Sequence, residues 1–120
     1  MSTANAYGVY EPWETVWLLN DKDCRVGVNI AQCKNLFFYG VEIQCGGSRT
    51  GAFGFSWPPS IRSMPYFSRY ACLLACKERV RQRLELEHQS ARDAKMKRII
   101  DRALNVVSYG TQKTLWEDRK

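Results

Sequence analysis

The segment LFFYGVEIQC, residues 36–45, decides the fold of this chain. Its side chains alternate between two faces. One face carries Phe37, Tyr39, Val41, Ile43 and Cys45, and the other carries Phe38, Gly40, Glu42 and Gln44. A period of two is typical of a β-strand, in which successive side chains point to opposite sides of a sheet. The segment therefore predicts a strand with one well-buried face.

Two shorter strands are predicted before it. Glu14–Asn20 (ETVWLLN) is rich in strand formers, and the polar run Asn20–Asp23 that follows has the composition of a turn. Cys24–Cys33 alternates again, with Cys24, Val26, Val28 and Ile30 on one side and Arg25, Gly27, Asn29 and Ala31 on the other. Lys34-Asn35 forms the next turn, so the strands follow one another as neighbours.

A fourth strand is predicted after the segment. Gly46-Gly47-Ser48 is a tight hairpin by composition, and Arg49–Trp57 follows with one bulky and one small face. The bulky face carries Phe53, Phe55 and Trp57, and the small face carries Thr50, Ala52, Gly54 and Ser56. The small face allows a backbone or a ligand to approach closely. Pro58-Pro59 ends the sheet, because proline cannot extend its hydrogen bonding.

The rest of the chain predicts one or two helices. After a connector at residues 60–67, Ser68 is a plausible N-cap for a helix from about Arg69 to Glu87, whose apolar stripe is Leu73, Cys76, Val80 and Leu84. Ser90 with Asp93 has the pattern of a capping box for a second helix ending at Gly110. That helix would carry Met96, Ile99, Ile100, Ala103 and Val107 on one side. A single long helix through residue 88 is the alternative.

These elements predict an α+β fold: a four-stranded antiparallel β-meander followed by one or two C-terminal helices packed on the sheet. At 120 residues the chain is expected to be a single domain, 1–120. Its sheet is expected at 14–57 and its helical part at 68–108. The ends, 1–13 and 111–120, are expected to be flexible or docking segments, with Leu115 and Trp116 docking somewhere.

The apolar surface exceeds what one layer of helix would cover. Phe38 lies on the face opposite the strand's main apolar row, and Trp13, Trp17 and Tyr39 add further ring area. A large exposed apolar area usually marks an interface or a binding groove. We therefore expect a homo-oligomer, a dimer or a higher closed assembly.

Cysteine usage and hydropathy bear on the compartment. Five cysteines and no basic, apolar leader at the N-terminus argue against a secreted disulfide framework, so all five are expected to be small buried hydrophobes. Cys72 and Cys76 share a helical face but lack the second pair that a zinc site needs. No apolar run reaches the roughly 18 residues of a membrane helix. The expected location is cytoplasmic (the host cytoplasm if phage-encoded), with no membrane partner.

The sequence lacks the motifs of common enzymes. It contains no G-x-S-x-G, H-E-x-x-H, Walker loop or G-x-G-x-x-G, and its single histidine, His88, has the neighbours of a surface residue. Glu42 could act as a base but has no visible partner. We therefore expect a binding protein rather than an enzyme, with no catalytic residue, no metal and no cofactor.

The charge is concentrated in the second half of the chain. Residues 1–60 carry four basic and five acidic side chains, whereas residues 61–120 carry fourteen and seven, within a net charge of +6. Such asymmetry indicates an anionic partner. The helical run that includes Lys77, Arg79, Arg81 and Arg83 is interleaved with acids, so a charge-laced solvent face is its commoner explanation.

A ligand site is predicted where arginines, hydroxyls and rings are interleaved along the strands and the connector. Guanidinium groups bind phosphate bidentately, aromatic rings stack on bases, and the first turn of a helix offers free N–H groups. The predicted ligand-binding residues are Arg25, Tyr39, Arg49, Thr50, Trp57, Arg62, Tyr66, Ser68 and Arg69. The alternative is that the rings belong to the core and the arginines to a solvated rim.

The order of a β-meander, a glycine-rich hairpin (Gly46-Gly47-Ser48), a proline exit (Pro58-Pro59) and trailing helices resembles the phage anti-Thoeris sponge proteins. The resemblance covers roughly Glu14 to Val107, in architecture, size and charge. It implies an oligomer that sequesters cyclic ADP-ribose-type or cyclic oligonucleotide signals without degrading them. A second resemblance, to single-stranded-DNA-binding coactivators of the PC-four type, stops near Glu87.

The expected function follows from these observations. The chain should capture a small anionic nucleotide in pockets at subunit boundaries, as in phage counter-defence. The alternatives are a single-stranded nucleic-acid-binding protein and, third, a protein inhibitor of a bacterial defence complex, although DNA mimicry would require an acidic rather than a basic chain.

Overall fold

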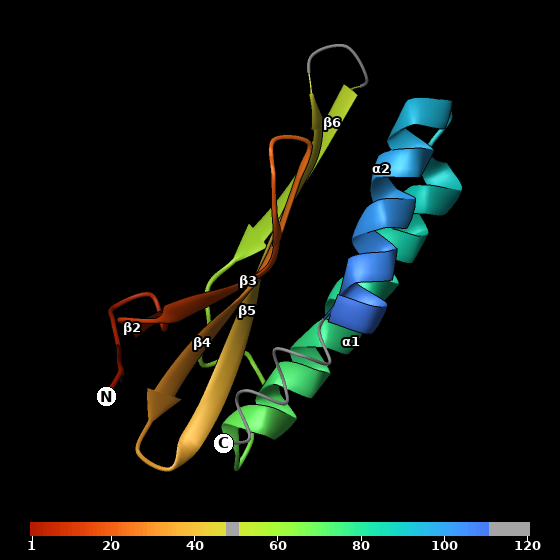
Figure 1. The fold of residues 1–120 in the computed structure, drawn as a ribbon. Coiled ribbons are helices and arrows are strands. Elements are labelled where there is room, and N and C mark those ends of the chain that lie inside the picture. The colour runs from red at the N-terminus through yellow and green to blue at the C-terminus, as the bar shows by residue number, and fades with distance from the viewer. Residues whose placement is uncertain (48–50, 111–120) are drawn as a thin grey trace.

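The computed structural model describes residues 1–47 and 51–110 and has an α+β architecture (Figure 1). Four strands form one antiparallel sheet in the order β3-β4-β5-β6. They span β3 Glu14–Asn20, β4 Cys24–Cys33, β5 Leu36–Gly47 and β6 Gly51–Trp57. The predicted fold class and meander are confirmed. The tip of the last hairpin, with Ser48, Arg49 and Thr50, lies outside the described residues, as does the tail 111–120.

Two helices pack against one face of the sheet (Figure 1). They are α1 Arg69–Ser90 and α2 Ala94–Asn105, and a π-helical turn, Val106–Gly110, follows α2. The predicted stripe of α1 is fully buried, and Met96, Ile100, Ala103 and Val107 are buried from the second helix and its extension. Neither helix in the described chain is long and apolar enough to span a membrane.

The core lies between this face and the helices. Val26, Val28, Val41 and Ile43 from the central strands are no more than 2% exposed, and they meet Leu84 of α1. The Phe53/Phe55/Trp57 row packs at the edge of the same core. The alternation in β4 and β5 therefore arises because one face of the sheet packs against one layer of helices.

The N-terminal segment, expected to be flexible or docking, forms regular structure and packs on the sheet. Two short strands, β1 Thr3–Ala4 and β2 Tyr10–Glu11, pair with each other. The turn between them is held by the Asn5 side-chain oxygen, which accepts from the backbone N–H of Tyr7 and of Val9. Tyr10 then stacks on Phe38 with ring centroids 4.3 Å apart, so part of the outer sheet face is covered from within the same chain.

The helical part contains two helices, but their boundary differs from the predicted capping box. Helix α1 continues through Ser90, and the N-cap of α2 is Asp93, whose carboxylate accepts from the N–H groups of Lys95 and Met96. Asp is among the best N-caps, and Ser90 is used as the last residue of α1 instead. The N-cap of α1 at Ser68 is confirmed: its hydroxyl accepts from the Ala71 N–H at 3.0 Å.

The expectation that all five cysteines are small buried hydrophobes outside any disulfide is wrong for Cys24 and Cys45, which are buried but paired, and for Cys33, which is not fully buried. Cys24 and Cys45 lie opposite each other on β4 and β5, both facing the core, and the structure joins them in a disulfide. Cys33 is half-buried, and Cys72 and Cys76 are buried thiols. Burial raises the pKa of Cys72 to about 12, and it raises the pKa of Cys76 well above the ordinary value, so both remain protonated.

Candidate functional site

The site is built by the connector that leaves the sheet after Trp57. The chain crosses the outer face of β5 directly over Gly40. A Cβ atom at this position would lie 2.2 Å from the Trp57 carbonyl oxygen and 2.5 Å from the Pro58 carbonyl carbon. Only a residue without a side chain allows this crossing. Pro58-Pro59 both end β6 and direct the chain over the sheet.

Backbone hydrogen bonds then hold the connector on both sides. On the outer side, Tyr10 N–H donates to the Pro59 carbonyl at 3.0 Å, and Ile61 N–H donates to the Gly8 carbonyl at 2.8 Å. On the helix side, Tyr66 exchanges hydrogen bonds with Phe37 of β5, at 2.8 and 2.9 Å. The segment is thus a fixed wall and not a free loop.

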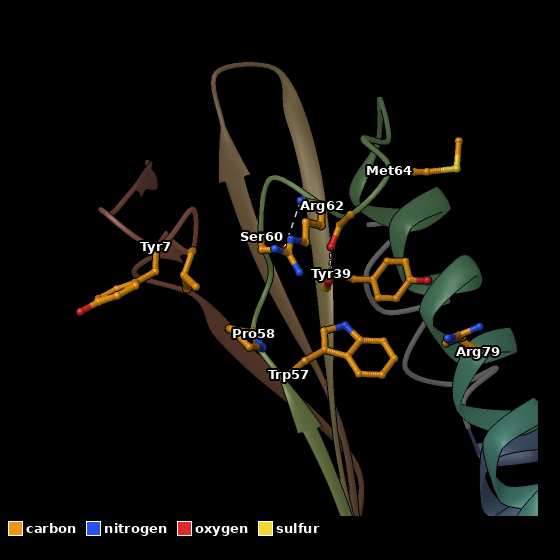
Figure 2. Close-up of a pocket in the computed structure, with 10 residues that line it drawn as sticks. Tyr7, Tyr39, Trp57, Pro58, Ser60, Arg62, Met64 and Arg79 are labelled. Atoms are coloured by element: carbon orange, nitrogen blue, oxygen red, sulfur yellow. Dashed lines mark hydrogen bonds between the residues drawn. The ribbon is translucent and has the colours of Figure 1, made fainter.

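An open pocket of about 700 Å³ lies along this wall, and we call it the connector pocket (Figure 2). Its volume falls within the roughly 300–1,000 Å³ range of small-molecule sites. Its lining comprises Tyr7, Val9, Tyr39, Trp57, Pro58, Ser60, Arg62, Ser63, Met64 and Arg79. Figure 2 shows the Tyr39 and Trp57 rings directed toward α1, where Arg79 lies, with Tyr7 on the opposite side.

Two arginines border the pocket. The Arg79 guanidinium lies over the Trp57 ring, 5.6 Å from its centroid, and Arg62 is exposed on the connector. Within residues 1–47 and 51–110, neither has a carboxylate within ion-pair distance. Both cations are therefore available to an anion.

Other arginines of the chain are neutralised locally. Arg81 pairs with Glu78 and Glu85, and Arg83 pairs with Glu87 at 2.9 Å. Arg102 pairs with Asp21 at 2.7 Å. The interleaved charges of α1 beyond the pocket thus form the solvent-facing ion pairs that the sequence favours, each of small energetic value.

Tyr39 contributes a neutral donor beside these cations. Burial raises the pKa of its phenol, and the nearby Cys76 and Tyr66 act in the same direction. Its backbone is fixed by the Ser63 hydroxyl, which donates to the Tyr39 carbonyl at 3.0 Å. The hydroxyl therefore remains protonated at neutral pH and can donate a hydrogen bond.

The structure brings together part of the predicted site. Tyr39, Trp57 and Arg62 line the connector pocket. Tyr66 lies next to it, with its ring centroid 6.1 Å from that of Tyr39. These residues come from β5, β6 and the connector, and the crossing at Gly40 is what brings them side by side.

The remaining predicted residues lie elsewhere. The Ser68 hydroxyl caps α1, and Arg69 pairs with Glu14 of β3, both away from the pocket lining. Arg25 lies over the Trp17 ring at 4.6 Å and donates to the Asn20 side chain at 3.1 Å. Arg49 and Thr50 lie outside the described residues.

Sequence reasoning missed Arg79 as a pocket residue. It was included only in the basic run of the helix, where nothing in the spacing sets it apart. Its place follows from the contact of Cys76, three residues earlier, whose thiol donates to the Gly40 carbonyl at 3.4 Å, and only the structure shows this contact. Arg79 lies about one turn further along α1 and lines the pocket.

Glu42 also has partners that the sequence did not reveal. Its carboxylate accepts from the Ser56 hydroxyl at 2.8 Å and from the buried Asn29 amide at 3.4 Å. Asn29 in turn accepts from the Thr15 hydroxyl at 2.7 Å, so one polar row crosses all four strands on the outer face. This face is more polar than the sequence indicated. In the described chain no cluster of three or more His, Cys, Asp or Glu could hold a metal ion.

Comparison with known proteins adds no family: no protein-family model, curated protein or solved structure matches this chain.

Proposed function

We propose that this protein binds a small anionic nucleotide in the connector pocket and holds it without converting it chemically. The observation that carries the proposal is the convergence of the Trp57 and Tyr39 rings with two arginines, Arg62 and Arg79, that have no acidic partner in the described chain. A base stacks on an aromatic face while guanidinium groups neutralise its phosphates.

The features of the pocket favour binding over reaction. Tyr39 is a protonated donor, and the cations need no activation to bind phosphate. A sequestering role, as in the phage anti-Thoeris sponge proteins that the chain resembles, would use such a site. A cyclic ADP-ribose-type or cyclic oligonucleotide signal is the ligand class that we propose.

The test measures thermal protection by cyclic ADP-ribose, a cyclic dinucleotide, oligo-dT and inorganic phosphate. A ligand that binds the folded state stabilises it by an amount that grows with the logarithm of its concentration relative to Kd. We expect a cyclic nucleotide to raise Tm at micromolar concentration and to be recovered intact. Protection by oligo-dT alone, abolished by salt, would instead support a single-strand nucleic-acid binder.

Variants locate the site. Arg62→Ala and Arg79→Ala should each weaken nucleotide affinity about tenfold or more, because each removes a charge-assisted contact to phosphate. Tyr39→Phe keeps the ring and should cost a smaller factor. The matched control is Arg98→Ala, which removes an exposed arginine from α2, outside the pocket lining. Equal losses in Arg98→Ala and Arg79→Ala would contradict the assignment.

A further inference from the structure

The sheet has two edge strands, and they differ in how they end the sheet. β3 and β6 are its outer strands. The edge of a sheet offers unpaired backbone N–H and C=O groups that can pair with another chain, and natural proteins usually block such edges. Each edge can therefore pair with another chain unless a structural feature prevents it.

The β3 edge is blocked. Its register with β4 shifts between Trp17 and Leu19, which marks a bulge, and Glu14 places a charge on the strand. The π-helical turn Val106–Gly110 also packs against β3. Bulges, charges and covering segments are the usual means of preventing edge pairing.

Among residues 1–47 and 51–110, nothing gives the β6 edge any of these features. Its register with β5 is unbroken from Val41 opposite Trp57 to Gly47 opposite Gly51. GAFGFSW contains no charge and no proline. In the described parts of the chain, only β5 pairs with β6. This edge is therefore open to a further strand.

We infer that the β6 edge binds the β6 edge of a second copy of this chain, antiparallel about a two-fold axis. Gly54 is the middle residue of Gly51–Trp57, so a symmetric pairing places Gly54 opposite its own counterpart. Phe53 then faces Phe55 of the other copy twice, and aromatic cross-strand pairs stabilise a sheet. The two sheets would continue as one of eight strands.

The absence of charge on β6 permits a second copy to bind at this place. A chain of net charge +6 repels its own copy over most of its surface, so the contact needs an uncharged strip. The Arg83 guanidinium lies 4.6 Å from the Phe55 ring centroid, and it is neutralised by Glu87. Two-fold pairing at Gly54 therefore places no charged residue of β6 itself at the axis.

The test uses Gly54→Lys. A Cβ at Gly54 has no neighbour nearer than 3.8 Å, so the side chain fits the single copy, but two lysines would meet at the two-fold axis. We expect the native protein to be a dimer by light scattering, and Gly54→Lys to raise its dissociation constant about tenfold or more, with unchanged circular dichroism.

Gln44→Lys is the matched control. Gln44 is exposed and lies opposite Gly54 on β5, so this variant adds the same charge on the neighbouring strand, away from the edge, and should remain dimeric. Mixing Gly54→Lys with Gly54→Glu should restore a dimer, because opposite charges then meet at the axis. A native monomer, or a Gly54→Lys protein that still dimerises normally, would overturn the inference.

A second measurement needs no variant. Amide hydrogen exchange of the native protein should slow in β6 as concentration rises, whereas that of β3 should not change. A dimer whose β6 amides stay unprotected would overturn the inference. Both measurements are made without nucleotide, so their outcome is independent of the proposed function.

Discussion

Gly40 is the residue on which the connector pocket depends. It lies in the middle of β5, where glycine weakens a strand, and it is the point at which the chain after Trp57 crosses the sheet. All three atoms that a Cβ would meet are backbone atoms, at 2.2 to 2.8 Å, so no side-chain rotation can relieve the contact. The cost of a weaker strand position is offset by the placement of Trp57, Pro58 and Pro59.

We expect Gly40→Ala to lower the free energy of unfolding by about 1–3 kcal/mol, the range for overpacked sites, and to weaken nucleotide binding as the pocket wall shifts. Urea unfolding measures the first effect and calorimetric titration the second. A Gly40→Ala protein as stable as the native protein would show that the crossing is not tight.

At the scale of elements, the start of each helix is set by one capping side chain, and the two helices use different residues. Ser68 caps α1 through the Ala71 N–H, and Asp93 caps α2 through two N–H groups. Each satisfies donors that the first helical turn otherwise leaves unpaired. Ser90, which resembles a cap in the sequence, is the last residue of α1, and Asp93 caps α2 instead.

Ser68 and Ser90 both resemble N-caps in the sequence, but only Ser68 is the N-cap of a helix in the structure. Ser68→Ala should lower the free energy of unfolding by about 1 kcal/mol, the usual cost of losing an N-cap hydroxyl. Ser90→Ala should change it by less than about 0.5 kcal/mol, as an exposed surface substitution does. Thermal or urea unfolding of both variants decides the matter, and equal losses would contradict the observed helix boundary.

At the scale of the whole molecule, the turn between β3 and β4 is tied to α2. The Asp21 carboxylate accepts from the Cys24 N–H at 2.9 Å and the Asp23 N–H at 3.0 Å, and it pairs with Arg102 at 2.7 Å. These contacts, led by the Cys24 hydrogen bond, lower the pKa of Asp21 despite partial burial. One carboxylate thus links the far end of the sheet to the helical layer.

Stability should depend on pH through this group. A folded-state pKa below that of an unfolded aspartate, about 4, stabilises the fold above that pH, and the contribution is lost as pH falls through the lower folded value. We therefore expect Asp21→Asn to be less stable than the native protein near neutral pH. The difference should shrink as the solution is acidified below about pH 3, as followed by urea unfolding at each pH.

One outcome of the Asp21→Asn comparison would contradict a role for the charge. A difference between the two proteins that stays constant across the acid range would mean that Asp21 acts through its shape and not through its charge. Arg102→Ala serves as the companion variant, because it removes only the ion pair and leaves the turn's hydrogen bonds in place.

The sequence by itself determined the four strands of the main sheet and the first helix. Alternation in Cys24–Cys33 and Leu36–Cys45, the turns between them and the stripe Leu73, Cys76, Val80 and Leu84 are local patterns, because side-chain direction follows directly from backbone geometry. The α+β class and the meander order follow because four strands joined by short turns are followed along the chain by helices.

Only the tertiary structure decided which chemistry-bearing residues meet. Tyr39, Trp57, Arg62 and Arg79 come from four segments and converge because the chain crosses over Gly40 and α1 then packs on the opposite face of the sheet. Arg25 and Arg69, equally plausible in sequence, are occupied by Trp17 and Glu14 instead. Long-range contact between side chains depends on the path of the whole backbone, which no local period encodes.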